Sequence, residues 1–256
     1  MKKKFKYIYG PVSSWRLGRS LGIDPISQKD KICSFDCVYC QVGRMKPKVI
    51  NRKVYIPTKK IIKELQRLPK VKVDYITLSA RGEPTLAKNL GDLIRKIKQV
   101  RKEPVVVLTN ASLINKEEVR KALAFSDYVF AKLDAGSASL FRKINKPCKT
   151  VKFNNVINGL KKFKHEYKGF FALQIMFLDE NKKYAHALYK IAKKIRPDQI
   201  QINTPLRPCK CKPLSKSAIA KISRKFSDFN TVSVYDSKRK KVKPLNKAET
   251  LKRRAS

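Results

Sequence analysis

The sequence predicts an α/β protein whose strands and helices form a closed or partly closed (βα)6 barrel. Short runs rich in β-branched and aromatic residues recur along the 256-residue chain, and amphipathic stretches with helical spacing lie between them. Each strand and its following helix repeat after roughly 25 to 35 residues, a length that suits successive βα units. Because the runs are apolar throughout, they predict a parallel sheet covered by helices.

The predicted strands share a core of Val, Ile, Leu and aromatic residues. They span residues 19–26, 73–79, 104–110, 128–134, 170–178 and 198–205. Between them, apolar residues at intervals of three and four predict helices over 90–100, 116–125, 156–163 and 185–195. Active sites of such barrels lie on the loops that follow the C-terminal ends of the strands, so the chemistry is expected there.

The predicted domain organisation has two parts. Residues 1–208 form the core barrel with an N-terminal extension, and residues 209–256 form a short C-terminal α/β appendage with a basic tail. The appendage is predicted from a helical pattern over 215–226 and a β-branched run over 231–235.

Composition indicates a globular protein outside the membrane. The apolar fraction is 42%, and no run approaches the roughly 18 to 20 apolar residues of a membrane helix. The N-terminus is basic, but Pro11, Ser13 and Ser14 interrupt any signal-peptide core. We therefore expect a cytoplasmic monomer with no membrane contact.

The formal net charge of +42 is extreme, with 61 basic and 19 acidic side chains. Such a charge attracts polyanions, which makes tRNA a candidate partner. A lysine-rich proteome would produce the same composition, and the sequence leaves both explanations open. The densest basic runs, at 2–4, 238–241 and 252–254, are predicted to be frayed tails.

Three of the six cysteines lie within eight residues, in "CSFDCVYC" (residues 33–40). A structural zinc site takes four protein ligands, usually as two pairs, and ferredoxin-type clusters add a fourth cysteine at a defined offset. The trio Cys33, Cys37 and Cys40 instead suits a [4Fe-4S] cluster with one iron left open. The alternative is three buried structural cysteines.

"CSFDCVYC" is similar to the signature of the radical S-adenosylmethionine (radical SAM) superfamily, including Tyr39 before the last cysteine. "SARGEPTL" (residues 79–86) resembles the Gly-Gly-Glu segment that in this superfamily holds the amino group of SAM. Gly82 and Glu83 match it, whereas Arg81 stands where the first glycine often lies. Segments 9–24, 132–147 and 201–208 resemble small iron–sulfur oxidoreductases related to wyosine-type tRNA-modifying enzymes.

The resemblance implies a fold, two cofactors and a reaction. The fold is a partial (βα)6 radical SAM barrel, and the three cysteines bind three irons while SAM chelates the fourth. A flavodoxin- or ferredoxin-like donor reduces the cluster, and reductive cleavage of SAM forms a 5′-deoxyadenosyl radical. The protein supplies orientation and tunes the cluster potential.

Further SAM contacts are predicted from positions at strand ends. Tyr39 is expected near adenine, Asn110 near ribose or carboxylate, Asp134 near the ribose hydroxyls and Asn203 near adenine. Each has a plainer alternative: packing for Tyr39, a helix cap or turn for Asn110, a turn for Asp134 and a buried amide bonded to the backbone for Asn203.

Other polar residues near the predicted mouth are weaker candidates. Arginine suits phosphate or carboxylate groups on a substrate, although a solvated surface position is the default for arginine in so basic a protein. The candidates are Arg16, Arg19, Arg142 and Arg207. Cys209 and Cys211 are read as half-buried thiols or an auxiliary cluster site, and Cys148 as a packing residue.

Three functions follow. The first is a radical SAM enzyme that modifies a tRNA or other RNA base. The second keeps the radical chemistry but acts on a protein or peptide. The third is a non-catalytic iron–sulfur or zinc RNA-binding protein, which would bind metal but not SAM.

Overall fold

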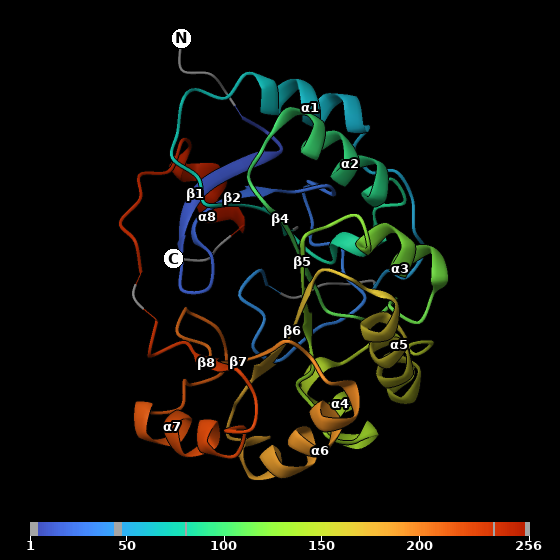
Figure 1. The fold of residues 1–256 in the computed structure, drawn as a ribbon, viewed down its shortest axis with the longest axis vertical. Helices are drawn as coiled ribbons and strands as arrows, with labels where there is room; N and C mark the ends of the chain where they lie inside the picture. The colour runs from blue at the N-terminus through green and yellow to red at the C-terminus, as the bar shows by residue number, and fades with distance from the viewer. Residues whose placement is uncertain (1–4, 44–47, 80, 238, 254–256) are drawn as a thin grey trace.

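The computed structural model describes residues 5–43, 48–79, 81–237 and 239–253. It contains an eight-stranded sheet in which the strand order follows the chain order. The first pair is antiparallel and all later pairs are parallel. The sheet curls into a half-barrel, which confirms the predicted α/β fold (Figure 1). The strands are β1 (Ile8–Ser14), β2 (Gly18–Ile23), β3 (Tyr75–Leu78), β4 (Val105–Thr109), β5 (Tyr128–Lys132), β6 (Phe170–Met176), β7 (Gln199–Asn203) and β8 (Thr231–Ser233).

All six predicted strands are present, but both edges of the sheet differ from the expectation. The N-terminal extension forms strand β1, which pairs with β2 as a hairpin that the serine- and proline-containing segment had concealed. Strand β8 pairs with β7 in parallel, so the predicted C-terminal appendage adds a strand to the same sheet. The domain boundary at residue 208 stays a prediction.

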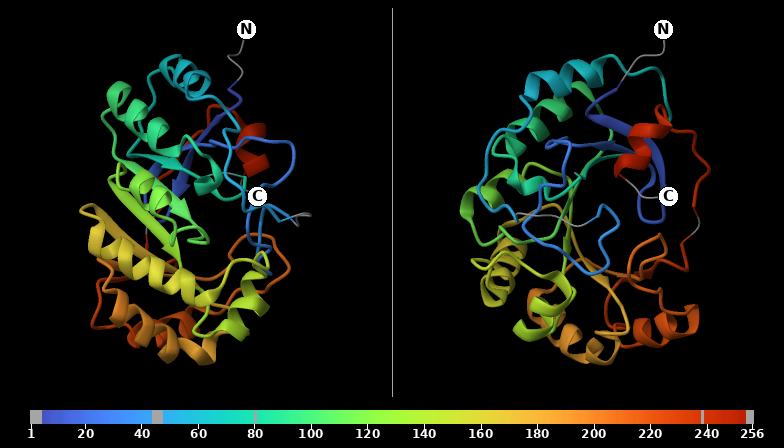
Figure 2. Two further views of the ribbon diagram at one scale, coloured as in Figure 1. Left: turned by 90° about the vertical axis from the view of Figure 1, so that its right-hand side faces the viewer. Right: turned by 180° about the vertical axis from the view of Figure 1, so that it is seen from behind.

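Helices cover the outer face of the sheet (Figures 1 and 2). Three of them, α1, α4 and α8, were not predicted, although α1 and α4 each bury apolar residues along one face. Among the described residues, no helix is both long and apolar enough to cross a bilayer. The helices are α1 (Thr58–Gln66), α2 (Leu90–Val100), α3 (Glu117–Leu123), α4 (Ala138–Asn145), α5 (Phe153–Glu166), α6 (Ala185–Ile195), α7 (Lys216–Arg224) and α8 (Lys247–Arg253), with 3-10 turns η1 (Pro84–Leu86) and η2 (Lys182–Tyr184).

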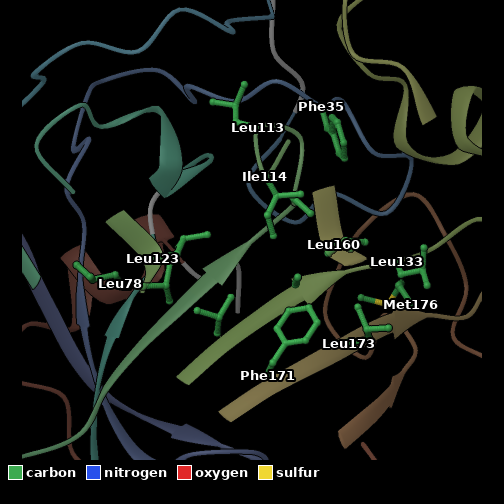
Figure 3. Close-up of a cluster of buried hydrophobic side chains, with 14 of the residues drawn as sticks. Phe35, Leu78, Leu113, Ile114, Leu123, Leu133, Leu160, Phe171, Leu173 and Met176 are labelled. Carbon is green, nitrogen blue, oxygen red and sulfur yellow. The ribbon is translucent and has the colours of Figure 1, made fainter. Parts of the chain in front are cut away.

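Alternation along each strand separates the core from the barrel interior. In β6, Phe171 and Leu173 are buried toward the helices, where Leu123 of α3 and Leu160 of α5 also lie (Figure 3). Gln174 lies on the opposite face, because successive side chains point to opposite sides of a sheet. The outer face therefore forms the hydrophobic core, and the inner face is free to carry function.

The C-terminal segment crosses the open side of the half-barrel, from β8 back to the β1–β2 hairpin (Figures 1 and 2). The backbone N–H of Leu245 donates to the carbonyl of Gly10 at 2.6 Å. Arg253 of α8 forms an ion pair with Asp24 at 2.9 Å, and their side chains are 5% and 0% exposed. The prediction of a frayed tail is therefore wrong for residues 252–253, which belong to α8. Residues 239–241 are exposed and lie outside any helix or strand, although Lys240 pairs with Asp74 at 3.0 Å. Residues 2–4, 238 and 254 of the predicted tails lie outside the described part.

Candidate active site

The cysteine loop follows β2 and is anchored to the loop after β3. Ile32 and Gly82 form an isolated parallel bridge, in which the N–H of Glu83 donates to the carbonyl of Ile32 at 2.9 Å. Gly82 has φ +152°, and a Cβ added there would lie 1.6 Å from the carbonyl oxygen of Ile32. Only glycine permits this approach. Gly82 thus sets the position of the segment that leads into Cys33.

The three predicted cysteines converge on one cavity of about 240 Å³. Burial raises the pKa of Cys33 to about 12 and that of Cys37 to about 11. Thiolates, not thiols, bind iron, so binding a cationic cluster here would release protons. Burial opposes the charge of Lys31, but its electrostatic interactions with Cys40 and Cys33 raise its pKa above the ordinary value.

The environment of the sulfurs fits an iron–sulfur cluster. Cys33 Sγ lies 3.4 Å from Asn110 Nδ2 and 3.5 Å from the N–H of Phe35, and Cys37 Sγ lies 3.6 Å from Asn145 Nδ2. Such hydrogen bonds tune cluster potential. Within the described ranges, no three Cys, His, Asp or Glu side chains are grouped to hold a single metal ion.

Glu83 lines the same cavity but is 1% exposed and heavily hydrogen-bonded. Its Oε1 accepts from the backbone and hydroxyl of Thr85 at 3.1 and 2.7 Å and from the hydroxyl of Thr109 at 2.6 Å. Oε2 accepts from the N–H of Asn110 at 2.6 Å and keeps a lone pair for a ligand ammonium. Burial raises the pKa of Glu83 despite these bonds.

Tyr39 and Asp134 bind one another, and of the two only Tyr39 lines the cysteine cavity. The Tyr39 hydroxyl donates to Asp134 Oδ2, which also accepts from Asn145 Nδ2 at 2.8 Å. Oδ1 accepts from the N–H of Met176 at 2.9 Å. Burial, and then the Asp134 carboxylate, raise the pKa of Tyr39. The side chain of Asp134 is fully buried, so it ties the cysteine loop to β5, β6 and α4 in place of the predicted ribose contact.

The two asparagines occupy different places. Asn110 lines the cysteine cavity, and its Nδ2 also lies 3.0 Å from Ser34 Oγ. Asn203 lines a second cavity of about 240 Å³ inside the half-barrel, which we call the basic chamber. The basic chamber borders the cysteine cavity, because both are lined by Gln41, Ser79, Leu108, Lys132, Gln174 and Met176.

Two of the four predicted arginines lie in the basic chamber. Arg16 donates to Gln201 Oε1 at 3.2 Å, and Arg207 donates to Gln41 Oε1 at 3.3 Å. Arg19 instead pairs with Asp74 at 2.5 Å near the N-terminal end of β2, opposite the cysteine loop. Arg142 is exposed on α4 and lines neither cavity. The predicted substrate role is thus not supported for these last two residues.

Sequence reasoning did not identify several residues that line these two cavities. The missed residues were Gln41, Ser79, Lys132, Gln174 and Met176, together with Arg239 and Arg253 on the C-terminal segment. Polar residues at alternate positions within apolar strands, such as Lys132 and Gln174, were the available signal. Arg239 and Arg253 had no such signal, because only the return of the chain across the barrel brings them there.

The remaining cysteines lie outside these two cavities. Cys209 and Cys211 line a hollow on the outer side of the cysteine loop, which Cys37 and Cys40 also border. Burial and the Glu180 carboxylate raise the pKa of Cys211 to about 11. The side chain of Cys148 packs against the core, as expected.

A cysteine loop at the C-terminal edge of a curled parallel sheet, facing a cavity inside it, is the arrangement expected of a radical SAM enzyme. The family model described as the radical SAM superfamily matches residues 31–192. A UPF0026 protein of Synechocystis sp. is 40% identical over 217 residues, which cover 84% of this chain and 80% of the relative. A UPF0026 protein of Methanocaldococcus jannaschii is 36% identical, over 88% of this chain and 71% of the relative. The chain belongs to the radical SAM superfamily and, at this identity, to the UPF0026 family.

The fold is also similar to that of Streptococcus suis SuiB bound to the precursor peptide SuiA. The TM-score is 0.65 at 17% identity, and the match covers 85% of this chain and 49% of SuiB. The chain thus spans about half the length of that protein. The predicted relationship to wyosine-type tRNA-modifying enzymes stays a prediction.

Proposed function

We propose that this protein binds a [4Fe-4S] cluster through Cys33, Cys37 and Cys40 and cleaves SAM reductively to modify a tRNA or other RNA base. The observation that carries the proposal is the convergence of these three thiols with Gly82, Glu83 and Asn110 on one cavity at the C-terminal ends of the strands. When bound, the cluster would pass one electron to the sulfonium of SAM, giving methionine and a 5′-deoxyadenosyl radical that takes hydrogen from the substrate.

The protein's own residues would hold and orient these groups. Gly82 brings the cysteine loop against the loop after β3, and Glu83 Oε2 offers an acceptor for an ammonium group. Asn110 and Asn145 place amide donors beside two of the sulfurs, where they would stabilise thiolates. The buried Tyr39–Asp134 contact keeps the loop in register with β5.

The first test is release of 5′-deoxyadenosine by anaerobically reconstituted, dithionite-reduced protein. Cys37→Ala is expected to abolish release and lower bound iron, whereas the matched Cys148→Ala is expected to keep both, because Cys148 lies outside the cavity. Release that persists in Cys37→Ala would refute the mechanism. An intact cluster without release in the unmodified protein would favour the non-catalytic binding protein.

An RNA substrate is supported by the net charge of +42, which favours contacts to phosphates. Release that rises when tRNA from the same source is added would support this choice. The likeness to SuiB, a protein crystallised with a peptide, motivates a peptide substrate as the second candidate. Release indifferent to tRNA but stimulated by peptide would favour it. The proposed electron donor is a flavodoxin- or ferredoxin-like protein, and the proposed enzyme is a cytoplasmic monomer.

A further inference from the structure

The basic chamber is lined by more cationic side chains than the cysteine cavity beside it. They are Arg16, Lys132, Arg207, Arg239 and Arg253. Among the described residues that line the chamber, none is Asp or Glu. Hydroxyl and amide groups fill much of the remaining wall, including Ser20, Thr77 and Asn203. This lining stabilises a negative charge and offers it hydrogen-bond donors.

The lining does not simply repeat the lysine bias of the chain. The protein carries 45 lysines and 16 arginines, yet the chamber is lined by one lysine and four arginines. Arginine presents a planar fork that matches phosphate oxygens, whereas lysine is a point charge. A surplus of arginine inside a lysine-rich protein therefore indicates recognition of a particular anion rather than general surface charge.

Three of the four arginines have contacts that hold them in place. Arg16 lies over the rings of Trp15 and Phe130, at 5.2 and 5.6 Å from their centroids. Arg207 is oriented by Gln41 from the cysteine loop. Arg253 is bonded to Asp24 and Glu249, so much of its charge is balanced and its contribution is smaller. Arg16, Arg207 and Arg239 complete the set of arginines that line the chamber.

We propose that the basic chamber binds a phosphate group of a nucleotide substrate and holds that nucleotide beside the cofactor cavity. The inference rests on the proposed function, because it assigns the substrate class of the same active site. Lys132, Gln174 and Met176 belong to both cavities, so a nucleotide anchored in the chamber lies next to the cofactors. The phosphate can come from a free nucleotide or from a residue of RNA.

Trp15 lines the chamber and is the chain's single tryptophan, so its fluorescence reports binding there without any turnover. The reconstituted protein is titrated with inorganic phosphate, uridine monophosphate and uridine at constant ionic strength. A pyrimidine is used so that the probe does not imitate the adenosine of SAM. Phosphate and uridine monophosphate are expected to change the fluorescence saturably, and uridine at least about tenfold more weakly.

Variants separate recognition from general charge. Arg207→Ala is expected to weaken binding of uridine monophosphate about tenfold, with Arg207→Lys in between. The matched Arg142→Ala, on the exposed face of α4, should change it by less than about twofold. Equal losses in Arg207→Ala and Arg142→Ala, or equal binding of uridine and its monophosphate, would overturn the proposal.

Two further measurements identify the source of the phosphate and separate this inference from the proposed function. Displacement of uridine monophosphate by tRNA assigns the phosphate to RNA, and no displacement assigns it to a free nucleotide. Loss of binding in the presence of saturating SAM would make the chamber part of the SAM site and overturn the inference. Phosphate binding without 5′-deoxyadenosine release would leave this inference standing while the proposed function fails.

Discussion

Gly82→Ala tests how strictly the loop after β3 positions the cysteine loop. An added Cβ would lie 1.6 Å from the carbonyl oxygen of Ile32, which is backbone and cannot rotate away. Separating the two segments breaks the bonds from Glu83 N to Ile32 O and from Ile32 N to Arg81 O, at 2.9 and 3.2 Å. Each lost hydrogen bond removes about 1 kcal/mol and the backbone strain of alanine at this φ adds about 1–3 kcal/mol, so the free energy of unfolding should fall by about 3–5 kcal/mol.

The assay is urea unfolding followed by circular dichroism, together with iron bound after reconstitution. Gly43→Ala is the matched control, because Gly43 also has a positive φ of +97° but nothing lies within 4 Å of its added Cβ. The control should lose only about 1 kcal/mol and keep its iron, whereas Gly82→Ala should also bind less iron. Equal stability and equal iron content in the two variants would refute the reasoning.

Three further substitutions test other contacts. Asp134→Asn removes a buried acceptor of several hydrogen bonds, so it should lower the free energy of unfolding by about 2 kcal/mol and weaken iron retention. In the same unfolding and iron assays, the surface substitution Asp179→Asn should change neither quantity. Arg253→Ala leaves the buried Asp24 carboxylate without its guanidinium partner, so it should lower the free energy of unfolding by about 3 kcal/mol and speed proteolysis of the C-terminal segment. A loss of unfolding free energy no larger than that of Lys252→Ala would contradict this expectation. Although burial acts to raise it, hydrogen bonds from Arg19 and Lys240 hold the pKa of Asp74 at about 2, below its ordinary 3.8. Its stabilising contribution is therefore present above about pH 4 and lost as the pH falls toward 2, so urea midpoints of Asp74→Asn and the unmodified protein should differ more at pH 7 than at pH 3.

The order of strands and the place of the cysteines were predictable because both depend on local patterns. Apolar runs of strand length mark the parallel strands, and "CSFDCVYC" follows one of them. The hairpin β1–β2 was not predicted because proline and serine in β1 weaken the local strand signal. The pairing of β2 with β3, which joins the hairpin to the rest of the sheet, is a long-range contact.

The partners of individual polar side chains were less accessible to sequence reasoning. Tyr39 and Asp134 were each expected at a SAM contact from their positions, yet they lie 95 residues apart and bond to each other. Arg19 and Arg16 are three residues apart on one hairpin, but only Arg16 lines the basic chamber. The position of a residue in the sequence indicates at which end of its strand it lies, but not the direction of its side chain.

By itself, the sequence determined the α/β class, the succession of βα units and the three thiols that define the superfamily, because these depend on short-range periodicity and spacing. Only the tertiary structure decided that the C-terminal segment returns across the half-barrel and brings Arg239 and Arg253 to the chamber that Arg16 and Arg207 line. That chamber is assembled from segments more than two hundred residues apart in the chain. Their meeting depends on the curl of the sheet and on the buried Arg253–Asp24 pair, neither of which leaves a local pattern in the sequence.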